Sequence, residues 1–155
     1  MEELQAFALS PAGMAQAEAF LSRNAAIENH LMLSHARMDR LREQKKLLEK
    51  DGGNHPEKQQ LLQKMHRMEK EILRDLQRLL STEAEIANTV RSLPDENLRT
   101  VLEMRYLHHV QYYAIAEKMH MDERHVYRLR KKALQQAAMI LAMAGKITAG
   151  QDAGN

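Results

Sequence analysis

The stretch Tyr112–Leu134, "YYAIAEKMHMDERHVYRLRKKAL", decides the fold, because two helical patterns meet in it across a short break. Apolar residues recur at helical spacing on both sides of that break. They are Ile115, Ala116 and Met119 before it, and Val126 and Leu129 after it. The interruption lies near His120, so the stretch predicts two short helices joined by a tight turn.

A tight crossing of two helices assigns a role to each of five residues. The first helix needs a small residue where it meets the second, and Ala116 stands at that position. The turn needs a residue that tolerates a positive φ, and histidine is enriched in that region, which suits His120. Met121 is expected to fill the core from the turn, while Val126 and Leu129 face inward.

The second helix of this stretch concentrates positive charge. Residues 122–132, "DERHVYRLRKK", hold five Arg and Lys against two acids, a net +3, whereas the whole chain has a net charge of only +2. Asp122 is a good N-cap for this helix. The helical spacing leaves six basic, aromatic or imidazole residues on outward or flanking faces, namely Arg124, His125, Tyr127, Arg128, Lys131 and Lys132.

A helix-turn-helix with a basic outer face is typical of proteins that place the second helix in the DNA major groove. Arg124 and Arg128 lie four residues apart near the helix start, where recognition helices contact bases. Lys131 and Lys132 come later and suit phosphate contacts, and Arg130 points elsewhere, toward backbone or an acid. The other interpretation, a solvated basic face on an ordinary helical bundle, remains open at this point.

The longer segment Leu93–Leu134, "LPDENLRTVLEMRYLHHVQYYAIAEKMHMDERHVYRLRKKAL", resembles region 4 of sigma-70-type factors. In those factors Leu-Pro opens a helix, Arg-Tyr closes it, "IAE" marks the scaffold helix and "V-Y-R-L-x-x-x-AL" forms the recognition helix. The segment is more similar still to phage and prophage late transcription regulators of the ArpU/RinA type, which place such a domain behind a long helical hairpin. The resemblance implies that DNA faces five residues here: Arg124, His125, Tyr127, Arg128 and Lys131.

The sequence departs from this pattern in two ways. His120 stands in the turn where Gly or Asn is usual, and no segment resembles sigma region 2. The chain is therefore not expected to act alone as a sigma factor.

Residues 24–92 predict a coiled-coil-like helical hairpin. The first helix carries a stripe with alternating spacings of four and three: Ile27, Leu31, Ser34, Met38, Leu41, Lys45 and Leu48. The second carries Leu62, Met65, Ile72, Leu76, Leu79, Ile86 and Val90, supported by Leu61, Met68 and Leu80. Between them, "KDGGNHPEK" provides Gly52 or Gly53 to close one helix, and Asn54 or His55 with Pro56 to open the next. A capping box, Thr82-x-x-Glu85, allows a break near Ser81.

The remaining segments have weaker patterns. Residues 1–23 predict one or two short helices or a flexible arm, with Ser10 and Pro11 as a helix start. Residues 93–145 form the expected helix-turn-helix domain, in which the apolar extension "AAMILAMAG", 137–145, is a candidate contact patch for a partner. Residues 146–155 have little to bury and are expected to be a disordered tail.

Composition predicts an all-α fold and excludes several kinds of site. Aromatic residues make up 4%, and six Gly, three Pro and no Cys are present. Strands need more aromatic and β-branched residues, and without Cys there is no disulfide, thiolate metal site or Cys nucleophile. The eight His lack zinc-helix spacing and no Gly-rich phosphate loop occurs, so we expect no enzyme, metal or cofactor. The acidic N-terminus and the lack of a long apolar run predict a cytoplasmic protein without a membrane segment.

The combined expectation is a sequence-specific double-stranded DNA-binding transcription regulator, with the helix 122–132 in the major groove. Its expected partners are duplex DNA, host RNA polymerase and further copies of itself, as a homodimer or higher oligomer. The alternative is a helical adaptor or a phage packaging component similar to a small terminase subunit, which shares the motif but differs in its oligomeric mass.

Overall fold

The computed structural model describes residues 1–50, 52–53 and 55–149, and within these residues every regular element is a helix. The all-α expectation is therefore confirmed. The described residues form two compact units. The head unit contains residues 1–23 and those from 83 onward, and the hairpin unit contains residues 24–82. No helix in the described part of the chain is long and apolar enough to cross a membrane.

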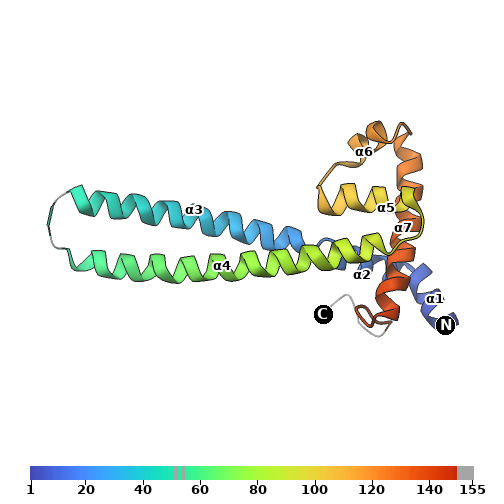
Figure 1. Cartoon of the computed structure of the whole chain (residues 1–155), viewed down its shortest axis with the longest axis horizontal. Helices are drawn as coiled ribbons and strands as arrows, with labels where there is room; N and C mark the ends of the chain where they lie inside the picture. Colours follow the sequence, from blue (N-terminus) through green and yellow to red (C-terminus); the bar gives the residue numbers. More distant parts are fainter. Residues whose placement is uncertain (51, 54, 150–155) are drawn as a thin grey trace. The chain divides into compact units, whose positions relative to one another are not determined.

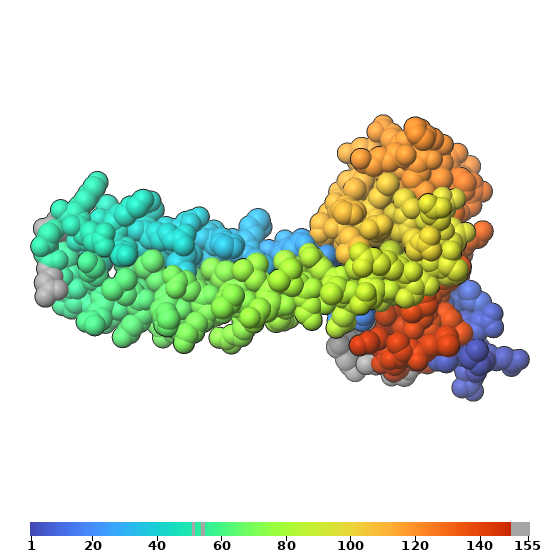
Figure 2. Space-filling view, in the orientation of Figure 1, coloured from blue at the N-terminus to red at the C-terminus, as the bar shows by residue number. Residues whose placement is uncertain are grey.

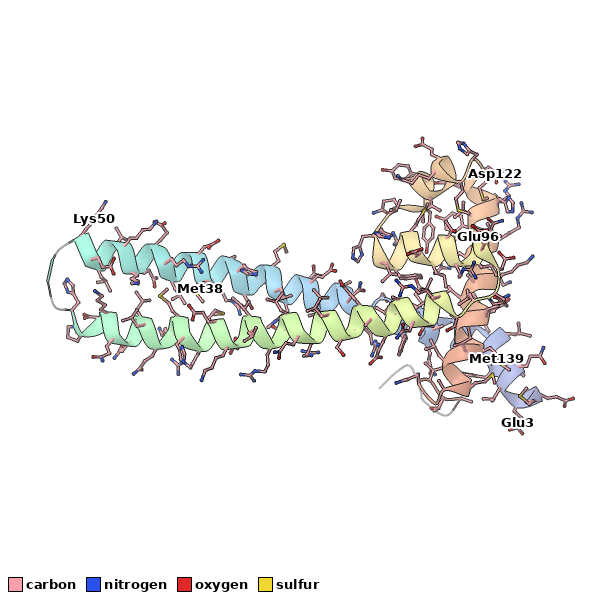
Figure 3. The ribbon with its side chains drawn as sticks, in the orientation of Figure 1. Glu3, Met38, Lys50, Glu96, Asp122 and Met139 are labelled. Atoms are coloured by element: carbon pink, nitrogen blue, oxygen red, sulfur yellow. The ribbon has the colours of Figure 1, made fainter. Side chains whose placement is uncertain are left out.

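The hairpin unit is an antiparallel pair formed by α3 (Arg23–Lys50) from residue 24 onward and by α4 (Pro56–Arg91) up to residue 82, as Figure 1 shows. The stripe predicted for the first helix is confirmed, because Ile27, Leu31, Ser34 and Met38 are buried and Leu41, Lys45 and Leu48 are half-buried. Met38 lies between the two helices in Figure 3, and the space-filling view shows them side by side (Figure 2).

The seam of α4 differs from the prediction by one residue at several positions. Leu62, Leu76 and Leu80 are 41%, 40% and 67% exposed, so their assignment to the seam is wrong. The predicted positions Met65, Ile72 and Leu79 are confirmed as half-buried, and the supporting residues Leu61 and Met68 also lie in the seam, where the buried Asp75 takes the place predicted for Leu76. They follow the alternating spacing of four and three that keeps one stripe toward the partner helix. Two leucines are adjacent at 61–62, and either can satisfy the helical period, so the pattern alone does not show that Leu61 is the buried one.

The seam contains polar residues that fix its alignment. Asp75 is buried, and its carboxylate pairs with His30 Nδ1 at 2.5 Å and lies 3.6 Å from Arg78. A polar pair at a seam position stabilises only the register in which both partners meet, at some cost in stability. The pairing of α3 with α4 is thereby specified more sharply than by Leu and Met contacts alone.

The turn of the hairpin agrees with its sequence pattern. α3 ends at Lys50, Gly52 has φ +61°, and Pro56 is the first residue of α4. The predicted cap at Asn54 lies outside the described residues. The helix α4 then continues without interruption to Arg91, so the break expected near Ser81 is wrong. Thr82 lies in its interior and caps nothing.

In the head unit, residues 1–23 form α1 (Glu2–Leu9) and α2 (Pro11–Leu21), which both pack against α7 (Glu123–Met143). Ser10 caps α2 as predicted, because its hydroxyl accepts a hydrogen bond from Gly13 N–H at 3.1 Å. The corner between the two helices is tight. A Cβ on Gly13 would lie 2.0 Å from the carbonyl oxygen of Phe7, so only glycine fits there.

The apolar extension 137–145 is not the exposed patch that the sequence predicted. Ala137, Ala138 and Leu141 are buried in the head core together with side chains of α1 and α2. The first residues of the predicted tail also differ from expectation, because Ile147 is buried in the same core. Residues 150–155 of that prediction lie outside the described residues.

Candidate nucleic-acid interface

The helix-turn-helix stretch forms around a small apolar cluster of its own. Its elements are α5 (Glu96–Leu102), the π-helical segment η1 (Glu103–Leu107), α6 (Tyr112–Lys118) and α7. Val101, Ile115, Ala116 and Val126 are buried together, and the half-buried Met119, Met121 and Leu129 pack against them. Ala116 is 5% exposed where α6 meets α7, and its single methyl lets the two backbones approach closely. Four of the five predicted motif residues, Ala116, Met121, Val126 and Leu129, thus share one core, while His120 is exposed in the turn.

The turn between α6 and α7 has the geometry that its residues predict. His120 has φ +56°, the left-handed conformation expected there. Met121 N–H donates to the Ala116 carbonyl at 3.0 Å, which closes the end of α6. Asp122 then caps α7, since its carboxylate accepts from His125 N–H at 2.8 Å (Asp122 is labelled in Figure 3). The direction of α7 is therefore set by one backbone hydrogen bond in the turn and by the cap from the Asp122 carboxylate.

The first turns of α7 present a polar surface opposite this core. All six residues predicted to face DNA are exposed: Arg124, His125, Tyr127, Arg128, Lys131 and Lys132. Val126 on the other side is fully buried. A shallow hollow of about 550 Å³ is lined by His125, Arg128, Leu129, Lys131, Lys132 and Gln135. The structure brings these bases to one surface, while Arg124 and Tyr127 do not line the hollow.

Tyr127 has a packing contact that the sequence did not indicate. Its ring lies 5.0 Å from that of Tyr112, centroid to centroid, at an interplanar angle of 43°. Such a tilted pair is a favourable aromatic arrangement. Tyr127 is still 49% exposed, so the contact with α6 orients its ring without burying it.

Arg130 is the one arginine of the predicted recognition helix that the fold uses internally. Its Nη2 pairs with Glu18 of α2 at 2.8 Å, and its Nε donates to the Tyr112 hydroxyl at 2.7 Å. The Tyr106 hydroxyl of η1 also donates to Glu18, at 3.3 Å. The expectation that Arg130 points away from the outer face and pairs with an acid is confirmed.

This network changes the pKa of two of its members. Burial by itself lowers the pKa of Arg130, but the hydrogen bond to Glu18 and the neighbouring phenols raise that pKa above its ordinary value. Burial is also the main reason that the pKa of the Tyr106 phenol lies above its ordinary value. Arg130 is therefore charged and Tyr106 neutral near neutral pH.

Sequence reasoning missed Glu18 and the segment η1. Glu18 is the only charged residue between Glu3 and Arg23, and an isolated acid on an apolar helix is a usable signal for a buried partner. The π-helical segment had no recognised sequence signal. It brings Arg105 over the Tyr112 ring, with 4.7 Å from the guanidinium carbon to the ring centroid, and leads into His109 at φ +57°. Segments of this kind often occur at functional positions.

The described residues contain no group of three or more His, Asp and Glu side chains placed to hold a metal ion. The exposed Arg and Lys side chains of α7 can bind another molecule by charge and hydrogen bonds. Arginine donates in a planar fork that matches guanine edges and phosphate, and lysine provides a point charge.

One family model matches the chain, over residues 23–138, and its description is "Protein of unknown function (DUF722)". The matched range includes the whole hairpin and extends through α5, η1, α6 and most of α7. No curated protein and no solved structure matches the chain. The likeness to sigma region 4 and to ArpU/RinA-type regulators thus stays a prediction from the residues themselves.

Proposed function

The chain belongs to the DUF722 family, and from its own residues we propose that it is a sequence-specific, double-stranded DNA-binding transcription regulator. The observation that supports this most is the arrangement of α7. Val126 is locked into the motif core while Arg124 and Arg128 stand exposed one turn apart at the helix start. A plain solvated helix would need neither the left-handed turn at His120 nor the close crossing at Ala116.

In this proposal the first turns of α7 enter the major groove. Arg124 and Arg128 donate to base edges, and a good bidentate contact of Arg with guanine discriminates by about 1–3 kcal/mol. Lys131 and Lys132 lie a turn further along and contact phosphate, which positions the helix without reading sequence. His125 and Tyr127 lie beside these residues and can donate hydrogen bonds to the phosphate backbone of the DNA.

By the resemblance stated above, the regulated genes are late genes of a phage or prophage, and host RNA polymerase is the second partner. In this proposal the hairpin unit contacts RNA polymerase or associates with the hairpin of a second copy of the chain.

Fluorescence anisotropy with mixed-sequence duplex DNA over a range of salt concentrations tests the proposal. Lys131→Ala should weaken binding to every duplex and reduce the slope of log K against log salt by about 0.9, the effect of one lost phosphate contact. Arg128→Ala should weaken binding to preferred sequences more than to the mixture. The matched control is Arg42→Ala, which removes an exposed arginine of α3. Unchanged binding in the Arg128→Ala/Lys131→Ala double variant would reject the proposal.

A specific observation favours the second candidate, an adaptor that works by association. Four leucines of α4 lie exposed on one side of the helix: Leu62, Leu73, Leu76 and Leu80. A row of exposed leucines in a helix is typical of a protein interface. We propose a second copy as its occupant, because a twofold axis near Leu76 would place Leu73 against Leu80 of the second copy in both directions.

Light scattering distinguishes these states. The wild type should have twice the monomer mass and Leu73→Glu/Leu80→Glu the monomer mass, with unchanged helicity. A monomeric wild type would reject self-association, and a mass of many copies would favour the ring of a small-terminase-like component.

A further inference from the structure

The hairpin unit has two side faces of opposite character. In each helix, the residue that precedes a seam residue in the sequence lies about 100° around the helix axis from it, on one side of the hairpin. The residue that follows a seam residue lies about 100° away in the other direction, on the opposite side. Because the two helices are antiparallel, the residues that precede the seam residues lie on the same side of the hairpin in α3 and in α4, and so do those that follow them. We call the side before the seam the basic face and the side after it the leucine face.

The basic face carries five arginines and one lysine: Arg37 and Arg40 from α3, and Lys64, Arg67, Arg74 and Arg78 from α4. All six are exposed. The acids on this side are Glu71 and the buried Asp75, so six bases stand against two acids, a net +4. The leucine face has the other balance. Its acids within the hairpin unit are Glu28, Asp39, Glu49 and Glu69, against Arg42 and Lys46, a net −2.

The bases of the two helices converge on one groove. Arg37 and Arg40 of α3 line it together with Lys64 and Arg67 of α4, above Leu41 and Met68 of the seam, and Glu71 is the one acid in the lining. The groove has a volume of about 340 Å³. Within the described residues, no ion pair neutralises Arg37, Arg40, Lys64, Arg67 or Arg74, and Arg78 is the one that lies near Asp75, at 3.6 Å. By contrast, Arg42 and Lys46 on the leucine face lie 3.3 Å from Asp39 and 3.5 Å from Glu43.

We propose that the basic face of the hairpin is a second DNA-binding surface, which holds the phosphate backbone of duplex DNA without reading sequence. The proposal rests on the proposed function for the identity of the partner, duplex DNA. It places this additional DNA contact in the hairpin unit, whereas the proposed function places DNA on α7 of the head unit. Arginine is the residue that suits it, because its planar fork donates two parallel hydrogen bonds to a phosphate.

Two features favour duplex DNA over other polyanions. The hairpin unit contains no Phe, Tyr or Trp, so it offers no ring on which single-stranded bases could stack. The face is also charged or polar from Arg37 to Gln44 and from Lys64 to Arg78, with exposed leucines only beyond that part of α3, at Leu33 and Leu47. An acidic protein partner would therefore find no exposed apolar side chain among the cations, only the half-buried Leu41 and Met68 at the base of the groove.

The dimensions of the array also suit a duplex. Arg67, Arg74 and Arg78 lie along one helix over about 16 Å, at a rise of 1.5 Å per residue. A duplex presents one phosphate per about 1.7 Å of its axis, so several phosphates lie within reach of this row.

The test is a salt titration of duplex binding by the full-length chain, with a mixed-sequence duplex as the probe. Arg67→Gln/Arg74→Gln should reduce the slope of log K against log salt by about 1.8, which is about 0.9 for each lost phosphate contact. The matched control, Arg42→Gln/Lys46→Gln, removes the same charge from the leucine face of the same hairpin and should leave the slope within error. Circular dichroism checks that both variants keep their helices, as glutamine has a similar helix propensity to arginine.

Each further outcome decides between the proposals. An equal loss of slope in Arg67→Gln/Arg74→Gln and in the control Arg42→Gln/Lys46→Gln would show that only the net charge matters, and would overturn this inference. An unchanged slope in Arg67→Gln/Arg74→Gln would overturn it as well. If the hairpin variant loses slope while Arg128→Ala/Lys131→Ala binds as wild type, the basic face stands and the helix-turn-helix proposal fails. If the reverse holds, only this inference fails. Binding of polyglutamate with the same dependence on Arg67 and Arg74 would assign the face to an acidic protein and overturn it.

Discussion

The head unit and the hairpin unit both consist only of helices in their described parts, but different contacts hold them together. In the hairpin, two helices adjacent in sequence share one narrow seam, and that seam includes polar positions such as Ser34 and Asp75. In the head, the core combines side chains from segments more than a hundred residues apart, as with Phe20 of α2 and Leu134 of α7.

This difference separates local from long-range specification. The hairpin follows from a pattern that repeats within each helix and needs little beyond its turn. The head depends on the long-range pairing of Glu18 with Arg130 and also on a local contact at the corner between α1 and α2, where Gly13 meets Phe7. Comparable changes at packed contacts should therefore cost more in the head than in the hairpin, and the first two of three pairs of variants test that expectation. The third pair compares the left-handed residues of the two turns, where we expect the larger cost in the hairpin.

The largest contrast is expected at two glycines. Gly13→Ala places a methyl 2.0 Å from the backbone oxygen of Phe7, so α1 or α2 must shift, which should cost about 1–3 kcal/mol in the free energy of unfolding. Gly53→Ala brings its methyl 3.3 Å from the movable His55 ring and should change stability by less than about 0.5 kcal/mol. Urea unfolding measures both. Equal effects would show that the α1–α2 corner adds little to the stability of the head.

The second contrast concerns ion pairs. In a double-mutant cycle, Glu18→Gln and Arg130→Met should show a coupling of about 1 kcal/mol, since Arg130 is only 24% exposed and also binds Tyr112. The same cycle for Asp39 and Arg42, which are 74% and 57% exposed, should give less than about 0.5 kcal/mol. A coupling for Glu18 and Arg130 as small as that of the exposed pair would contradict the bracing role of Arg130.

The smallest contrast concerns residues with positive φ in the two turns. Gly52→Ala forces a Cβ into a left-handed conformation and should cost about 1 kcal/mol. His120→Gly relieves the same strain but adds freedom to the unfolded chain, so stability should stay within about 0.5 kcal/mol. Thermal unfolding compares them. A clear loss in His120→Gly would mean that its imidazole makes a contact on which the turn depends.

The sequence predicted well those features that local chemistry determines. The caps at Ser10 and Asp122, the stripe of α3 and the left-handed His120 each follow from residues within a few positions of one another. The seam of α4 was predicted less accurately, because at 61–62 either of two adjacent leucines could satisfy the helical period.

Long-range packing could not be predicted in the same way. The pairing of Glu18 with Arg130 joins residues 112 positions apart, and no local pattern states which acid meets which base. The apolar segment 137–145 was expected to be exposed for the same reason. The helices that cover it, α1 and α2, lie at the other end of the chain. An apolar face in either segment is equally compatible with packing inside the molecule and with binding another molecule, so the pattern does not show which occurs. For the candidate site, the sequence therefore identified the exposed residues of α7 but not the groups that brace them.

The central claim, that the exposed start of α7 reads DNA sequence, is tested most directly by selecting bound fragments from the source genome. The wild type should enrich fragments that share one sequence element. Arg124→Ala/Arg128→Ala should lose the preference at guanine positions within that element, while Arg42→Gln/Lys46→Gln keeps it. Recovery of the same element by the Arg124→Ala/Arg128→Ala variant, or the absence of any shared element with the wild type, would contradict the claim.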